Sequence, residues 1–135
     1  MRKHKIVFVF VVFAMITFLW SGCTTQRIFS RTESFESFYQ KFHNDTAFQH
    51  SRIHFPLQGK KVDSTGEQDW TLQNWTTLTI PVFEVDTSVF NVSYDQQPRS
   101  FTQKSWIDNS GFSVEFRFEV IRRKWFLVFA EEVNL

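Results

Sequence analysis

The chain has 135 residues, 15 of them basic and 14 acidic, which gives a formal net charge of +1. The first 22 residues hold three of the basic ones, so 12 basic residues face 14 acidic ones in the remainder, a balance that argues against a nucleic-acid-binding protein. A single cysteine excludes an internal disulfide, whereas aromatic residues, 19% of the chain, can build a core without one.

The N-terminus has the layout of a secretory signal. A basic head, Met1 to Lys5, precedes an apolar run from Ile6 to Trp20. This run is shorter than the roughly 20 residues that a helix needs to cross the hydrocarbon core of a bilayer. We therefore expect residues 1–22 to be a signal peptide that is removed, and not a permanent membrane helix.

Cys23 stands where a bacterial lipoprotein is cut and acylated. It follows the small residues Ser21 and Gly22, a pattern that resembles a lipobox, although Trp20 occupies the place where leucine is usual. An unpaired thiol in an exported chain needs such a purpose, and the alternative is a lone cysteine beside an ordinary cleavage site. We predict that Cys23 is lipidated, that residues 23–29 form a polar tether, and, by resemblance, that the anchor lies in the outer membrane of the cell envelope.

Residues 30–135 are predicted to form a single α+β domain that opens with helices. Ser30 and Glu33 form a capping-box pair, and Thr46 predicts the cap of a second, short helix that ends near Ser51. Between the two caps, four aromatic residues recur at helical spacing: Phe35, Phe38, Tyr39 and Phe42. One face of the first helix is therefore expected to be buried.

The pattern then changes to that of strands. Residues 52–57 alternate polar and apolar side chains up to Pro56, which predicts a strand at a sheet edge, because proline cannot donate to a ladder. Residues 61–69 are polar and predict a loop. Residues 74–85 and 88–94, rich in Thr, Val, Ile and Phe, predict a pair of strands.

The clearest pattern lies near the C-terminus. Apolar and charged side chains alternate over residues 114–120, and residues 125–129 continue the apolar series beyond a basic turn, Arg122-Arg123-Lys124. This predicts a long hairpin with one buried face. Helices followed by antiparallel strands predict an α+β fold in which the helices pack on one face of an antiparallel sheet.

The run from Phe35 to Leu57, FESFYQKFHNDTAFQHSRIHFPL, with the Trp-rich middle and the aromatic C-terminal hairpin, resembles a family of small uncharacterised Bacteroidetes lipoproteins, a domain of unknown function. The resemblance implies the nuclear-transport-factor-2-like, or cystatin-like, architecture: N-terminal helices in the concave side of a strongly bent antiparallel sheet. It implies no activity, because this architecture hosts isomerases, dehydratases and plain binding modules.

No pattern of residues marks a catalytic or metal site. His50 and His54 are four residues apart with Asp45 nearby, but Pro56 favours a strand at His54 and removes the helical spacing that a metal pair would need. The candidate acids and bases lie beside turn residues, where such groups usually cap or solvate the chain: His43, Asp45, Asp86, Asp95 and Asp108. We predict no catalytic residue, no cofactor and no metal.

Tryptophans are better candidates for ligand contact, because a large flat ring with one polar group suits sugar, peptide and protein surfaces as well as cores. Trp70, Trp75 and Trp106 are flanked by polar residues, so we predict that one or two of them line a groove; the alternative is packing under the loops that they begin. Trp125, in phase with the hairpin, is expected in the core. Arg52 is a candidate to bind a carboxylate ligand in the cone, or to form a structural ion pair.

Two surface features stay open. The basic turn Arg122-Arg123-Lys124 would contact anionic headgroups or be an ordinary solvated turn. Asp45-Thr46-Ala47 and Asp63-Ser64-Thr65 resemble the three-residue acceptor pattern for O-glycosylation in Bacteroidetes.

The function expected from the sequence is a lipid-anchored, non-enzymatic binding or scaffolding module that uses the concave face of the sheet for a small ligand, peptide or envelope protein. The alternative is an envelope enzyme of the isomerase or lyase type working in the cone. An apolar pocket around an unpartnered carboxylate or imidazole would favour the enzyme. A cone filled by phenylalanines would leave a surface-interaction protein.

Overall fold

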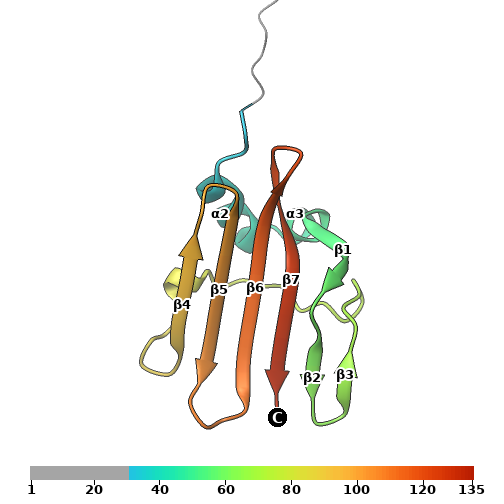
Figure 1. The fold of residues 1–135 in the computed structure, drawn as a ribbon, viewed down its shortest axis with the longest axis vertical. Helices are drawn as coiled ribbons and strands as arrows, with labels where there is room; N and C mark the ends of the chain where they lie inside the picture. Colours follow the sequence, from blue (N-terminus) through green and yellow to red (C-terminus); the bar gives the residue numbers. More distant parts are fainter. Residues whose placement is uncertain (1–30) are drawn as a thin grey trace, which may run out of the picture.

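The computed structural model describes residues 31–135. The expected signal peptide (1–22), Cys23 and the tether (23–29) lie outside the described residues. Two short helices lie on one face of a strongly curved sheet of seven strands (Figure 1). The predicted α+β class, with helices packed on one face of a bent sheet, is confirmed.

The helices are α2 (Phe35–Asn44) and α3 (Thr46–Ser51). Ser34, whose Oγ accepts from the Ser37 amide at 3.5 Å, is the N-cap of α2, so this helix begins later than the capping-box prediction placed it. Asp45 caps α3 in place of the predicted Thr46, because its Oδ1 accepts from the Phe48 amide at 2.9 Å. No helix within residues 31–135 is long and apolar enough to cross a bilayer.

The strands are β1 (Ile53–Gln58), β2 (Lys61–Asp63), β3 (Gly66–Gln68), β4 (Asn91–Gln96), β5 (Ser100–Ile107), β6 (Phe112–Ile121) and β7 (Lys124–Asn134). Their order is β3-β2-β7-β6-β5-β4, and β1 pairs with β7 alone, which confirms its edge position. β1 and β2 run parallel to β7 and all other pairs are antiparallel, so the sheet is mixed.

Gly59 lies between β1 and β2 and allows both strands to pair with β7, one after the other. Its φ is +87°, and a Cβ at this position would lie 2.0 Å from the Ala130 carbonyl oxygen of β7. Only glycine permits both the left-handed conformation and this close approach.

Two middle segments differ from the prediction. Residues 61–69 form the β2–β3 hairpin instead of a loop, because β2 gains a ladder with β7 that its polar composition does not reveal. Residues 74–85 form no strand; they run irregularly and include one short 3₁₀ turn, η2 (Val82–Glu84). The predicted strand 88–94 corresponds to β4, which begins three residues later, and β5 was not predicted.

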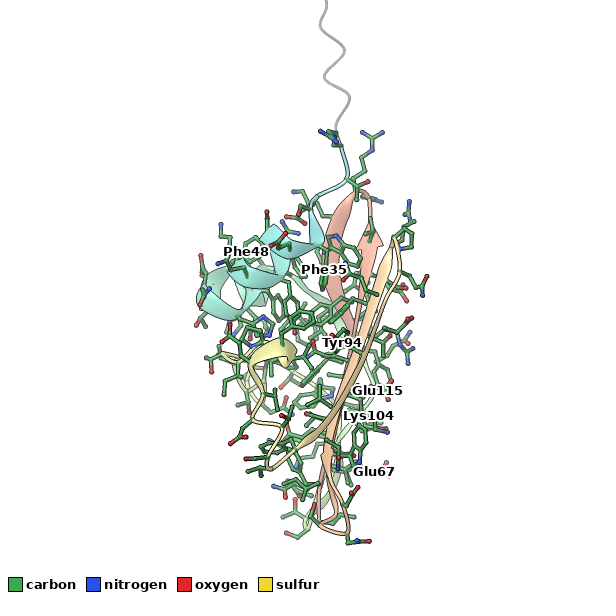
Figure 2. All side chains as sticks on the ribbon, turned by 90° about the vertical axis from the view of Figure 1, so that its left-hand side faces the viewer. Phe35, Phe48, Glu67, Tyr94, Lys104 and Glu115 are labelled. Atoms are coloured by element: carbon green, nitrogen blue, oxygen red, sulfur yellow. The ribbon has the colours of Figure 1, made fainter. Side chains whose placement is uncertain are left out.

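The predicted C-terminal hairpin is confirmed as β6 and β7. Its alternation places one set of side chains against the helices: Phe116, Phe118, Val120, Trp125 and Leu127, all buried. α2 adds Phe38, Tyr39 and Phe42 to the same core. The core thus lies between the helices and the concave face of the sheet, as the edge-on view of Figure 2 shows.

Candidate functional site

The concave face of the sheet is filled by side chains of the protein itself. Rings from α2 pack edge-on against Phe118 of β6, with centroid distances of 5.9 Å from Phe38 and 5.3 Å from Phe42. The side chains at the centre are at most 1% exposed: Phe38, Phe42, Phe101, Phe118 and Leu127. The space that the sequence interpretation gave to a ligand is therefore occupied by the core.

Residues 70–85, which we call the strap, cover the part of the concave face that the helices leave free. Gln49 of α3 holds the strap in place through hydrogen bonds. Gln49 Oε1 accepts from Trp75 Nε1 and from the Leu78 amide, both at 2.9 Å. Gln49 Nε2 donates to the carbonyl oxygens of Leu78 at 2.8 Å and Phe42 at 2.7 Å. These bonds satisfy strap groups that a β-ladder would otherwise pair.

Tyr39 fixes the far end of the strap. Its hydroxyl accepts from the Val82 amide at 3.0 Å and donates to Oε1 of the buried Gln103 at 2.5 Å. Burial raises the pKa of Tyr39 to about 12, so the hydroxyl stays protonated and able to donate. This network is structural, because its hydrogen bonds join α2 to the strap and to β5.

His43 is the one buried imidazole among the described residues. Its Nδ1 lies 2.8 Å from the Tyr39 carbonyl oxygen, which can only accept, so Nδ1 carries the proton. Its Nε2 is buried and has no hydrogen-bond partner among the described residues. Burial lowers the pKa of His43, and its ring packs against the rings of Tyr39 and Phe42 at 4.4 and 5.6 Å.

The structure brings two of the predicted ligand-binding residues, Trp70 and Trp75, into contact and buries both. Trp70 and Trp75 are 5% and 8% exposed and pack edge-on at 5.3 Å on the concave side. The Trp70 indole donates to the Ala130 carbonyl oxygen at 2.7 Å, so both rings fit the packing alternative. Trp106 is half-buried, borders a shallow groove of about 470 Å³ near the β5–β6 turn, and donates to Asp108 Oδ1 at 3.0 Å. Ligand binding by these tryptophans stays a prediction.

Arg52 forms a structural ion pair. Its guanidinium donates to both carboxylate oxygens of Glu33, at 2.7 and 2.9 Å, and to the Trp125 carbonyl oxygen at 3.0 Å. Partial burial alone would raise the pKa of Glu33, but the Arg52 hydrogen bond, the Trp125 amide and nearby Lys124 hold it below its usual range. Glu33 therefore joins the chain to the hairpin and does not cap α2 as predicted.

The other candidate groups lie apart from one another. No group of three His, Cys, Asp or Glu side chains within residues 31–135 could hold a metal ion. Asp45 caps α3, Asp86 accepts from the Ser88 amide at 2.9 Å, and Asp95 accepts from Gln97 Nε2 at 3.1 Å. Thr46 and Ser64, in the two O-glycosylation patterns, are both exposed, and their modification stays a prediction.

The best candidate site is a surface groove between α2 and η2, beside the free edge of β4. It encloses about 450 Å³, and its floor is formed by Phe35, Tyr39, Pro81 and Phe83. Phe83 and Tyr94 are 55% and 56% exposed, and their rings meet edge-on at 4.9 Å. We call this surface the α2–η2 groove; Figure 2 faces it, with Phe35 and Tyr94 labelled.

The groove is apolar at its floor and acidic at its rim. Glu36 and Glu84 line it, and neither forms an ion pair with another described residue. Within residues 31–135, β4 pairs only with β5, so the backbone groups along its outer side have no strand partner there. The site therefore offers aromatic contacts, two carboxylates and an unpaired strand edge.

The sequence interpretation missed this site because it assigned residues 74–85 to a strand. A strand over these residues would place Phe83 on one face of the sheet. In the structure Phe83 lies in η2 and is exposed at the surface. Pro81 was the available signal, since proline is disfavoured inside a sheet and favours the start of a turn.

Comparison with known proteins supports the fold. One protein-family model matches residues 33–134, and no curated protein matches the chain. A cystatin-like protein from Bacteroides caccae has a TM-score of 0.58 and 22% identity, over 76% of this chain and 77% of the other. A protein from Bacteroides uniformis has a TM-score of 0.50 and 23% identity, over 78% of each chain. An NTF2-like protein from Bacteroides fragilis has a TM-score of 0.53 and 21% identity, over 77% of this chain and 48% of the other. Identities this low show a common fold and nothing of function.

Proposed function

This chain belongs to an uncharacterised family with the cystatin-like, NTF2-like fold, and on that premise we propose that it is a non-enzymatic binding module of the cell envelope. A lipid on Cys23 anchors it to the outer membrane, and the α2–η2 groove holds an extended segment of a partner protein. One observation carries the proposal: the concave face is filled by its own aromatic side chains, whereas Phe83 and Tyr94 remain exposed beside a free strand edge.

The chemistry of the groove defines the partner segment. An extended segment can add to β4 through main-chain hydrogen bonds, the mode known as β-augmentation. An apolar side chain of the segment would cover Phe83 and Tyr94. A basic side chain would approach Glu36 and Glu84, which have no ion-pair partner among residues 31–135. The partner is therefore a polypeptide segment with alternating apolar and basic residues.

The alternative, an isomerase or lyase working inside the cone, is supported less well, because side chains of the protein occupy the concave face. His43 has the expected form of a base, with a buried unpartnered nitrogen, but aromatic rings surround it. A catalytic base must reach a substrate atom within hydrogen-bond distance. Binding at the surface is the function that the geometry supports better.

The anchor is tested by Cys23→Ser in the cell of origin. The parent protein should carry a diacylglycerol mass on a chain that starts at Cys23, and it should sediment with the outer membrane. The variant should lose the lipid mass and appear in the soluble fraction. Equal membrane retention of parent and variant would refute the anchor.

The groove is tested by photocrosslinking in cells. Benzoylphenylalanine in place of Tyr94 should give a defined adduct, whereas the same residue in place of Ser93, the next position on the opposite face of β4, should not. Phe83→Ala with Glu84→Gln should reduce the Tyr94 adduct roughly tenfold, as expected for loss of a central contact. Leu72→Ala with Glu67→Gln, an equivalent change at another exposed site, should leave it unchanged.

Two outcomes would contradict the groove proposal. Equal adducts from positions 93 and 94 would mean that contact is not confined to the groove. An adduct of twice the mass of the chain would identify a second copy as the occupant and exclude a foreign segment.

A further inference from the structure

Five exposed basic residues gather at the end of the molecule where the described chain begins: Arg31, Arg99, Arg122, Arg123 and Lys124. Three separate segments supply them, namely the start of the chain, the β4–β5 turn and the β6–β7 turn. Figure 1 shows these two turns beside the start of the described chain. We call this surface the basic end.

Backbone hydrogen bonds hold the three segments together. The Glu33 amide donates to the Arg123 carbonyl oxygen at 2.9 Å, which ties the start of the chain to the β6–β7 turn. The Val120 amide donates to the Arg99 carbonyl oxygen at 3.0 Å, and the Arg99 guanidinium donates back to Val120 O at 3.3 Å. The basic end is therefore a fixed part of the fold.

Few carboxylates neutralise this charge. Glu33 is already paired with Arg52, and none of the five basic residues forms an ion pair with another described residue. Glu36 on α2, Asp95 on β4 and Glu119 on β6 are the further acids near these residues in the sequence, so three carboxylates stand against five basic side chains. The basic end thus keeps a net positive charge.

The remainder of the domain is acidic. Four of the 15 basic residues precede residue 31, which leaves 11 against 14 acidic ones in the described part, and five of the 11 belong to the basic end. The turns β2–β3 and β5–β6 and the C-terminus lie at the opposite end of the sheet (Figure 1). Acids dominate there and along the adjoining strands: Asp63, Glu67, Asp108, Glu131 and Glu132. The charge is therefore separated along the long axis of the domain.

The length of the tether limits where the basic end can be. Cys23 and Arg31 are eight residues apart, so the chain between them spans at most about 29 Å at roughly 3.6 Å per residue. A polybasic surface close to a lipid anchor gains attraction from anionic headgroups, which falls off within a Debye length of about 10 Å. The end from which the chain leaves is joined most directly to the anchor, and this end is the basic one.

We propose that the basic end docks on anionic phospholipid headgroups, so that the folded domain stands with its acidic end away from the bilayer. The inference rests on the lipid anchor at Cys23 proposed above. A diacylglyceryl group on Cys23 has two acyl chains and holds the protein at the bilayer by itself, so the basic end determines which part of the domain faces the headgroups. Docking also fixes the orientation of the α2–η2 groove relative to the membrane.

The orientation is tested with the acylated protein, purified from membranes and reconstituted into vesicles. Because Cys23 is the only cysteine, an introduced thiol can be labelled with a polarity-sensitive dye. Gln97→Cys places the dye in the β4–β5 turn, and Ser64→Cys places it in the β2–β3 turn at the opposite end. The vesicles are phosphatidylcholine alone, or the same lipid with roughly a third of phosphatidylglycerol.

The dye at position 97 should shift to the blue only on the anionic vesicles, and high salt should reverse the shift. The dye at position 64 should not respond. Arg122→Gln with Arg123→Gln should lower the ratio of docked to undocked protein roughly 25-fold, about fivefold per residue. Lys60→Gln with Lys104→Gln removes the same charge elsewhere and should leave the ratio unchanged.

Three results would overturn the inference: a shift that is independent of lipid charge, equal loss in both double variants, or the same shift with inorganic phosphate and neutral vesicles. The last would mean binding of phosphate itself.

If mass analysis finds no lipid on Cys23, the proposed anchor is refuted, independently of the docking inference. The chain from residue 23 with Cys23→Ser then decides, because sedimentation with anionic vesicles alone supports the basic end and equal sedimentation with both refutes it.

Discussion

Glu33 and Arg52 show how one ion pair connects distant parts of the chain. The two-point contact joins Glu33, two residues before α2, to Arg52, the residue before β1, and Glu33 also accepts from the Trp125 amide at 3.0 Å. The Arg52 side chain is only 11% exposed, so its charge depends on this partner. Removing one member of such a pair costs more than the pair contributes, because a charge stays buried without compensation.

We predict that Glu33→Gln lowers the free energy of unfolding by about 2 kcal/mol, measured by urea denaturation. The folded pKa of Glu33 is lowered, so its contribution is complete above the unfolded pKa and disappears as the pH falls through the lower folded value. The difference between parent and variant should therefore shrink in acid. Glu36→Gln, at an exposed unpaired position, should change stability by less than about 0.5 kcal/mol.

His43 also lowers the stability of the fold in acid. Burial lowers its folded pKa, so between the folded pKa and the unfolded value the unfolded chain binds more protons, and stability falls as the pH falls below about 6.5. Nearby Glu84 opposes this effect only in part. We predict that His43→Leu flattens the pH dependence of the urea midpoint just below pH 6.5. An unchanged slope in this variant would mean that another group titrates.

The strap shows why a strand prediction failed at the scale of elements. Residues 74–85 have the composition of a strand, but Gln49 of α3 and Tyr39 of α2 bond the backbone groups of Leu78 and Val82. Such tertiary partners are invisible to a local pattern, so composition alone favoured a ladder. The same cause hides β5, because the core position opposite Phe116 is held by a glutamine, Gln103, that the Tyr39 hydroxyl bonds.

Elements with strong periodicity were predictable. The alternation over residues 114–129 identified β6 and β7, and the aromatic spacing identified the buried face of α2. The β2–β3 hairpin was not predictable, because three-residue strands with mostly polar side chains gain their stability from the ladder with β7. The α2–η2 groove depends on the conformation of the strap and was missed with it.

We predict that Gln49→Leu loosens the strap specifically. The change leaves Trp75 Nε1, the Leu78 amide and two carbonyl oxygens without partners, at about 1–3 kcal/mol for each buried group that stays unpaired. The free energy of unfolding should fall by about 3 kcal/mol. Hydrogen exchange should accelerate first over residues 71–85. Gln40→Ala, an exposed glutamine on α2, should alter neither, and uniform acceleration through β6 would contradict a local role.

At the scale of the whole molecule, the two arginines of the β6–β7 turn contribute charge to the basic end and also adopt a strained backbone conformation. Arg122 and Arg123 have φ values of +47° and +70°, the combination that a type I′ hairpin turn requires. Asparagine and glycine adopt this conformation more readily than arginine, which costs about 1 kcal/mol or more per residue there. Arginine at these two positions therefore lowers the stability of the fold and adds two positive charges to the basic end.

We predict that Arg122→Asn with Arg123→Gly separates the two effects. The free energy of unfolding should rise by about 1 kcal/mol, because left-handed strain is relieved. Docking on anionic vesicles should fall roughly 25-fold, because two charges are lost. Arg122→Lys with Arg123→Lys keeps both charge and strain and should change neither quantity. If the Asn-Gly variant docked like the parent, the turn would carry no membrane contact, and its arginines would need an explanation within the fold.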